Sequence, residues 1–250
     1  MDSCKLSNIL RLMAWLALMM LGGCGSDDPV KGCALDRSFN APNGYAILPS
    51  IAGVGVSTGG VEAAVQPDGR IVVAGLRSGP LGDDVLVLRY TADGLLDASF
   101  GAGGIATFNG SGVGNDRALG LALQPDGKIL VAGESATALS QDALILRLLP
   151  NGTLDTSFAG QGVFLFNGPV GGLDRFFDVK VQADGKVLAA GSSAGVTGVD
   201  ILLVRLDPGG APDASFGAGA VGPGRVRQQP VGAAQRPARD DRNSRKIRRI

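Results

Sequence analysis

The sequence predicts an all-β protein built from repeated four-stranded units, and two observations carry this prediction. The segment Val65–Gly75 (VQPDGRIVVAG) returns with few changes at Leu123–Gly133 and at Val181–Gly191, so the motif recurs at intervals of 58 residues. A fixed period of this kind is typical of repeat architectures. Each unit also contains short apolar segments separated by turn-forming residues, which is the pattern of antiparallel strands.

Four strands are expected in each unit, and the second unit shows them clearly. Leucines alternate with small residues over 119–123, and the tight turn Gln124–Gly127 leads into a second apolar segment, 128–132. The third strand, 143–148, is almost continuously apolar and is therefore expected to be buried. A turn at 150–152 and the segment LDTSF precede the fourth strand, 162–166.

Such four-stranded units are typical of the blades of a β-propeller. One sheet cannot bury both of its faces alone, so neighbouring units have to stack. The repeats are expected at about 61–108, 119–166 and 177–221. Because known propellers have about four to eight blades, three blades predict an incomplete ring with an open apolar face at each end. The alternative fold is a β-trefoil, which also has three four-stranded repeats.

A further copy of the LDxSF motif, Leu35–Phe39, precedes the first repeat, and Tyr45 and Ile47 behind it are candidates for a lone strand. Residues 35–48 are therefore expected to be part of a blade. The combined pattern of QPDGKILVAG, a later NG turn and LDxSFG resembles the delta-60 repeat family of bacterial surface and secreted proteins. The resemblance covers roughly residues 35–221. It implies a β-propeller without a defined biochemical role and brings no catalytic residues with it.

The N-terminus, residues 1–23, is expected to be a lipoprotein signal peptide. Lys5 and Arg11 precede an apolar run, 12–21, that is too short to span a bilayer. The run ends in Leu-Gly-Gly-Cys, residues 21–24, which resembles a bacterial lipobox. The alternative is an ordinary signal peptide followed by a chance cysteine.

The lipobox resemblance implies cleavage before Cys24 and acylation of that residue, which would anchor the protein in a membrane. Residues 24–34 are expected to form a flexible tether. Since no Asp follows Cys24 directly, the usual sorting rule implies a cell-envelope protein of the outer membrane. Cys33 is then the one remaining ordinary thiol, and no reactive role is expected for it.

The C-terminal segment 222–250 departs from the repeat pattern. A fourth Gln-Pro-Asp-Gly is due at 240–243, where the chain reads Asp-Asp-Arg-Asn. Residues 225–250 carry a net charge of +7 and the remainder of the chain −7. We expect a basic disordered tail, and the interpretation we favour is a frameshift or truncation within a longer reading frame. The alternatives are a disordered segment without a selected role, and a tail that binds nucleic acid, lipopolysaccharide or anionic lipid.

The charged residues that recur in every unit are expected to be structural. They are Asp84, Asp142 and Asp200, and Arg89, Arg147 and Arg205. A catalytic site is made once from unlike residues, whereas these are copied in each repeat. The aspartates are expected to accept hydrogen bonds from turn or edge amides, and the arginines to pair with a carboxylate such as Asp97. The pairs Asp116-Arg117 and Asp174-Arg175 are expected to make contacts between blades.

The role that the sequence favours is that of a binding or scaffold module. The chain has no His, the commonest general base and metal ligand, and we expect no enzyme activity, metal, cofactor or specific nucleic acid. The loops 76–83, 134–141 and 192–199 are expected to form a rim that takes a protein or glycan ligand. The alternative is a glycan-acting hydrolase or lyase, for which two converging carboxylates would be needed.

Overall fold

The computed structural model describes residues 35–48, 57–110, 114–136 and 140–217, together with the backbone of 225–227. The chain divides into two compact units, Met1–Tyr45 and Ala46–Ile250. The signal peptide, Cys24, the tether and Cys33 lie outside the described residues, as does the expected tail apart from 225–227.

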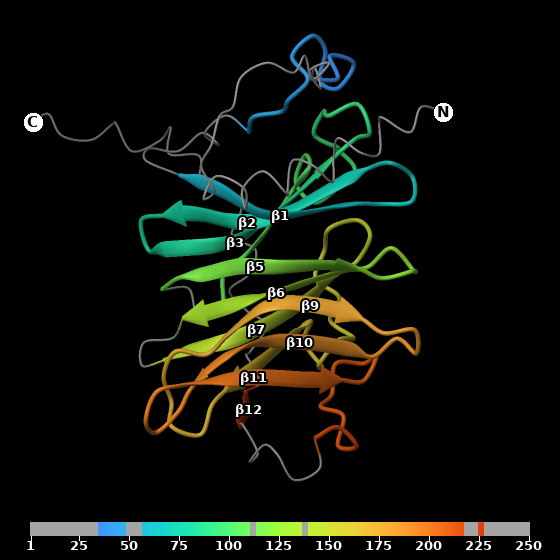
Figure 1. Cartoon of the computed structure of the whole chain (residues 1–250). Helices are drawn as coiled ribbons and strands as arrows, with labels where there is room; N and C mark the ends of the chain where they lie inside the picture. The colour runs from blue at the N-terminus through green and yellow to red at the C-terminus, as the bar shows by residue number, and fades with distance from the viewer. Residues whose placement is uncertain (1–34, 49–56, 111–113, 137–139, 218–224, 228–250) are drawn as a thin grey trace, which may run out of the picture. The chain divides into compact units, whose positions relative to one another are not determined.

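Three antiparallel sheets make up the described part of the second unit, and the all-β prediction is confirmed (Figure 1). Blade 1 consists of β1 (Thr58–Val65), β2 (Ile71–Gly79), β3 (Gly82–Tyr90) and β4 (Ile105–Phe108). Blade 2 consists of β5 (Asp116–Leu123), β6 (Ile129–Ala136), β7 (Gln141–Leu148) and β8 (Val163–Asn167). Blade 3 consists of β9 (Arg175–Val181), β10 (Val187–Ala194) and β11 (Val199–Leu206).

Two glycines of each repeat are required by the backbone. Gly127 closes the turn between β5 and β6 with φ of 81°, and its equivalents Gly69 and Gly185 have φ of 84° and 81°. Residues with a Cβ rarely adopt this region. Gly133 lies opposite an irregularity in β5, where a Cβ would come 1.9 Å from the carbonyl oxygen of Arg117. The recurrent glycines therefore allow the tight turn and the bulged first strand.

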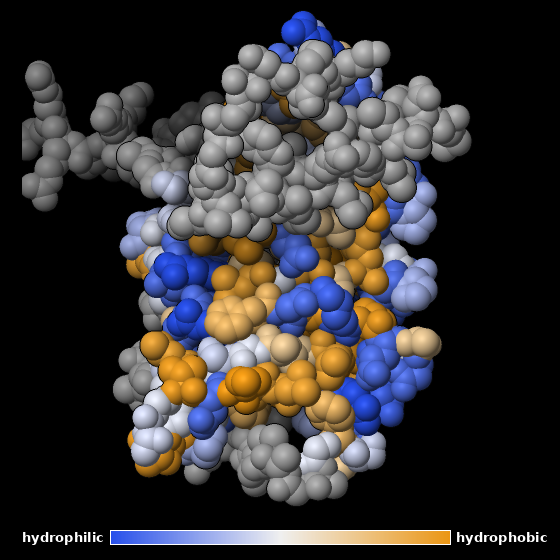
Figure 2. Space-filling view, viewed as in Figure 1, coloured by the Kyte–Doolittle hydropathy of each residue, from blue (hydrophilic) through white to orange (hydrophobic). Residues whose placement is uncertain are grey.

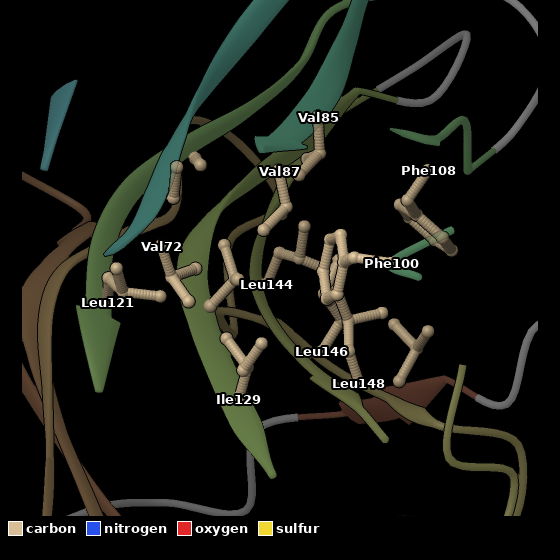
Figure 3. Close-up of a cluster of buried hydrophobic side chains, with 14 of the residues drawn as sticks. Val72, Val85, Val87, Phe100, Phe108, Leu121, Ile129, Leu144, Leu146 and Leu148 are labelled. Carbon is tan, nitrogen blue, oxygen red and sulfur yellow. The ribbon is translucent and has the colours of Figure 1, made fainter. Parts of the chain in front are cut away.

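The blades pack face to face, and the two clusters of buried apolar residues lie between them. In the first cluster, Val72 and Phe100 of blade 1 meet Leu121, Ile129 and Leu144 of blade 2 (Figure 3). The residues next to these along the strands of blade 2 point to the opposite face of the sheet. There they pack against blade 3 and form the second cluster. The alternation follows from the two-residue period of a strand. The first strand of each following blade lies across the preceding sheet, with β5 contacting blade 1 and β9 contacting blade 2.

The ring is not closed in the described part of the chain, because blades 1 and 3 each pack only on blade 2. This stacked arrangement rules out the β-trefoil. The prediction of two open faces is correct for blade 3. It is only partly correct for blade 1, where Leu86 and Leu88 are 3% and 6% exposed.

Two predicted strands have different outcomes. The fourth strand of blade 3, expected near Val221, lies outside the described residues. Within the expected tail, β12 (Arg225–Arg227) pairs antiparallel with β8 at the edge of blade 2, so these three residues are not irregular.

The segment 35–48, most of which belongs to the first unit, consists of turns and contains no strand, so the expected strand at Tyr45 and Ile47 is not formed there. Its LDxSF motif nevertheless has the same local structure as the later copies. Oδ1 of Asp36 accepts hydrogen bonds from the amide and the hydroxyl of Ser38, as Asp97 does from Ser99. The motif therefore folds through contacts within itself.

Candidate functional site

The two ends of the blade stack differ in how they use charged residues. At one end lie the turns between strands one and two and the LDxSF segments, and we call it the turn end. At the other end lie the turns between strands two and three together with the loops that join successive blades, and we call it the loop rim. Hydrogen bonds between Leu81 and Gly114 and between Gln141 and Gly172 hold these two kinds of loop together.

The turn end is built around one arginine in each blade, which we call the arginine clamp; it is buried in blades 1 and 2 and partly exposed in blade 3. In blade 2, Nε of Arg147 lies 2.8 Å from Oδ2 of Asp155, and Nη2 lies 3.3 Å from the hydroxyl of Ser157. The guanidinium also stacks on Phe158, 4.5 Å from the ring centre. Arg89 pairs with Asp97 and Arg205 with Asp213 at the same 2.8 Å. The predicted pairing of arginine and carboxylate is confirmed.

The clamp also joins successive blades, which the sequence pattern did not predict. Nη1 of Arg147 donates to the carbonyl oxygen of Pro208 in blade 3 at 2.7 Å, and Arg89 donates to that of Pro150 in blade 2. The amides of Gly101 and Ala159 donate to the next residues along the same turns, Asn151 and Gly209, each at 2.7 Å. A signal was present in the sequence, because the turns recur in register with the arginines.

The clamp carboxylates are held in their charged form. A hydrogen bond from the hydroxyl of Ser99, together with the nearby guanidinium of Arg89, holds the pKa of Asp97 below its ordinary value, although burial opposes this. A second cation also approaches each carboxylate. Arg70 lies 3.0 Å from Asp97, Lys128 lies 3.6 Å from Asp155, and Lys186 lies 3.1 Å from Asp213. These groups neutralise one another and leave no clamp carboxylate poised for proton transfer.

The prediction for the aspartates of the third strands was wrong in its detail. Asp84 pairs with Arg77 at 2.7 Å, and Asp142 accepts hydrogen bonds from Asn167 and Ser140. The edge amides are bound instead by Asp116 and Asp174, which accept from Gly110 and Gly168, each at 2.7 Å. Among the described residues, Asp84 and Asp142 thus bind side chains, and no backbone amide of that part of the chain is found to donate to them. Asp200, their equivalent in blade 3, is exposed on β11.

At the loop rim, ion pairs cross from one blade to the next. Nε of Arg117 in blade 2 lies 2.6 Å from Oδ2 of Asp83 in blade 1. Glu134 of blade 2 is almost fully buried and lies 3.2 Å from Arg175 of blade 3 and 3.6 Å from Arg117. The predicted role of Arg117 and Arg175 in contacts between blades is confirmed. Sequence reasoning missed Glu134, whose signal is a charge at a position where the other repeats have Leu76 and Ser192.

Asp116 is a carboxyl group at the rim whose pKa departs far from the ordinary value. Its side chain is buried, and this burial raises its pKa to about 6, with the negative charge of nearby Asp84 acting in the same direction. An Asp in the same place, Asp174, lies at the junction of blades 2 and 3. The repetition of this residue at both junctions favours a structural role for it.

The described residues include no group of three or more acidic, Cys or His side chains that could hold a metal ion. In the same part of the chain, no helix is long and apolar enough to cross a membrane. Cys24, the one residue for which the sequence predicts a modification, lies outside the described residues.

Comparison with known families agrees with the repeats. The model of a family described as a domain of unknown function (DUF5122) beta-propeller matches three segments of the chain, residues 66–100, 124–158 and 182–216. These segments begin at the turn between strands one and two and end at the Phe of the LDxSF motif, and they are 58 residues apart. No curated protein matches the chain. With three matched repeats and three stacked antiparallel sheets, the chain is a β-propeller repeat protein.

Proposed function

We propose that this protein is a lipid-anchored component of the bacterial cell envelope whose repeats act as a binding or scaffold module. The observation that carries the binding role is the difference between the two ends of the blade stack. The turn end repeats the same group of arginine, aspartate and serine in each blade, and each arginine is paired with its aspartate. The loop rim differs from blade to blade, as a surface that recognises one ligand requires.

The rim loops expose apolar side chains, which supports a ligand-binding role for them. Leu81 lies in the turn between β2 and β3, Val170 and Leu173 lie in the loop between blades 2 and 3, and Val196 lies in the turn between β10 and β11, and all are exposed. Exposed apolar groups among polar loops are typical of surfaces that contact proteins or the faces of sugar rings. A protein or glycan of the envelope is therefore the ligand class we propose.

Binding to a glycan is tested by sedimentation with purified peptidoglycan sacculi. The wild-type chain should sediment with the sacculi, and the double variant Leu81→Asp, Leu173→Asp should remain in the supernatant. The matched control is Leu95→Asp, a similarly exposed leucine at the turn end, which should bind like wild type. Equal sedimentation of all three proteins would contradict a site at the rim. No sedimentation of the wild type would contradict a peptidoglycan ligand.

The anchor is proposed from the resemblance of residues 21–24 to a lipobox, which implies attachment at the outer membrane. Cys24→Ser should move the protein from the membrane to the soluble fraction or leave it as unprocessed precursor, with Cys33→Ser as the control that remains in the membrane. Mass spectrometry of the mature N-terminus checks the acylation directly. An unmodified mature N-terminus in the native host would rule the anchor out.

The alternative is a glycan-acting hydrolase or lyase, and one observation favours it. Asp84 and Asp116 lie close together, and a carboxyl group with a pKa of about 6 suits a general acid. Against this, both side chains are buried and residues of the same type recur at the next junction. Release of new reducing ends from sacculi by the wild type, lost in Asp116→Asn, would decide for the enzyme.

A further inference from the structure

Blade 3 ends the described stack with a face that is covered in the other two blades. Ala143 and Ile145 of β7 are fully buried against blade 3. The residues at the same positions of β11 are Ile201 and Leu203, which are 93% and 42% exposed. Figure 2 shows apolar side chains at the surface over this end of the stack. This face of blade 3 thus carries the same kind of apolar residues as the two junctions between blades that are already formed within the chain.

Two hydrogen-bond donors at the edge of this face also have no acceptor within the part of the chain that the structure describes. In blade 2, Arg147 and Ala159 donate to two consecutive carbonyl oxygens, those of Pro208 and Gly209 in the following blade. The corresponding donors of blade 3 are Nη1 of Arg205 and the amide of Gly217. Neither has an acceptor among the described residues, although Arg205 is already held by Asp213 and stacked on Phe216. Blade 3 thus presents the donor half of a junction.

The acceptor half of such a junction is a turn that offers two consecutive carbonyl groups followed by a glycine with positive φ. Blade 1 has this turn in Ala92-Asp93-Gly94, 58 residues before Pro150-Asn151-Gly152, and φ of Gly94 is 84°. Ala92 and Asp93 are exposed, and no donor to their carbonyl oxygens is found in the described chain. The described part of the chain therefore carries both halves of the junction, one on blade 1 and one on blade 3.

The first strand of blade 1 supports the same assignment. Leu123 of β5 and Val181 of β9 occupy equivalent positions in their strands, and each packs against one of the two buried clusters between blades. Their equivalent in β1 is Val65, which is 46% exposed. Leu86 and Leu88 of β3, on the same face of blade 1, are already buried within the single chain, so the part of this face left for a contact is Val65 with the turn residues Ala92 and Asp93, which are exposed.

We propose that blade 3 binds blade 1 of a second copy of this chain, and that blade 3 of the second copy binds blade 1 of the first. The contact is head to tail, and contacts of this type form a closed ring when the rotation between subunits allows it. The three described blades of two chains together make six, which is within the range of about four to eight in known propellers. The occupant of the open face is thus a second copy of the protein.

The first test is the mass of the full chain in detergent, measured by analytical ultracentrifugation at micromolar concentration. The wild type should have the mass of two chains and Ile201→Asp that of one, since the charge faces solvent in the single chain and is buried in the pair. The control Leu81→Asp changes an exposed leucine at the rim and should leave two chains. A wild type that remains a single chain, or that grows into species of increasing mass, overturns the proposal. A single chain would mean that another blade or protein covers the face.

The second test locates the contact, in a background with Cys4, Cys24 and Cys33 replaced by Ser. Copies with Gly217→Cys are mixed with copies with Asp93→Cys under mild oxidation. A disulfide between the two kinds of copy is expected, because the equivalent pair Gly101 and Asn151 is joined by a backbone hydrogen bond of 2.7 Å. The cysteine is tolerated at position 217, since Ala159 at the equivalent site adopts φ of 50°. Leu81→Cys replaces Asp93→Cys as the control. Equal cross-linking with that control overturns the assignment.

Discussion

Blades 2 and 3 have nearly the same sequence pattern and the same order of their first three strands, yet only blade 2 is buried on both faces. Leu130 and Ile145 of blade 2 contact the following blade, whereas Leu188 and Leu203 of blade 3 are partly exposed. The difference comes from what lies next to each blade and not from its residues. A residue's contribution to stability in this fold is therefore set largely by the junction in which it takes part.

The largest expected effect comes from the aromatic ring of the clamp. Phe158 is fully buried and lies directly over Gly210 of blade 3. Phe158→Ala should lower the free energy of unfolding by about 4 kcal/mol, the usual cost of emptying a buried aromatic site. Phe216→Ala at the same position of blade 3 should cost less than half as much, because its ring is only partly buried. Urea unfolding followed by circular dichroism measures both, and equal losses would contradict the dependence on the junction.

The clamp arginines give the second comparison. Arg147→Ala leaves Asp155 buried without its main partner and should cost about 3 kcal/mol. Arg205→Ala removes the same pair from the more exposed end and should cost about 1 kcal/mol. The same urea experiment measures both changes, with Arg147→Lys as a variant that keeps the charge but not the planar contacts. A larger loss for Arg205→Ala than for Arg147→Ala would show that the bond to Pro208 contributes little.

A pH titration sharpens the comparison at the rim, where Asp116 lies close to Asp84 across the junction of blades 1 and 2. Because the folded-state pKa of Asp116 is about 6, above its ordinary 3.8, the folded protein holds a proton between these two values that the unfolded chain has released. This contribution to stability is present below about pH 4 and is lost as the pH rises through 6. Asp116→Asn should therefore stabilise the protein by about 2 to 3 kcal/mol at pH 7 and change little at pH 4. Thermal melts at the two pH values check this, and a uniform effect would contradict it.

The smallest expected difference in stability loss between blades 2 and 3 is at the turn glycines, because their backbone conformation is set within each turn. Gly127→Val and Gly185→Val should each cost about 1 to 2 kcal/mol through strain at positive φ. The space around both sites is the same, because a Cβ added at either glycine would lie 3.4 Å from a proline ring atom. The two blades should thus respond equally, as measured by urea unfolding. A clear difference would mean that the turns also depend on the neighbouring blade.

The sequence predicted the fold well because its signals are local. The turn glycines, the alternation in the strands and the pairing of Arg147 with Asp155 all depend on residues within one repeat. The repeated period then carried the prediction from one blade to three. The LDxSF segment at 35–39 is a further local success, since Asp36 and Ser38 form the same contact as the later copies even where Tyr45 and Ile47 form no strand.

The clamp contacts between blades were not predicted, although the turns recur in register with the arginines, because they join residues about 60 positions apart in different repeats. The bond from Arg147 to the carbonyl of Pro208 uses a backbone atom that any residue would supply. The proximity of Asp84 and Asp116 depends on how two sheets stack. Glu134 was missed since it occurs in one repeat alone. Sequence periodicity thus describes the blade, while three-dimensional stacking creates the site.

The reach of the arginine clamp has a consequence for how the protein is made. The acceptor of Arg89 lies in the turn of Pro150, and that of Arg147 in the turn of Pro208, so each partner is synthesised about 60 residues after its donor. A newly made blade therefore emerges from the ribosome with its clamp open and is completed only when its successor follows.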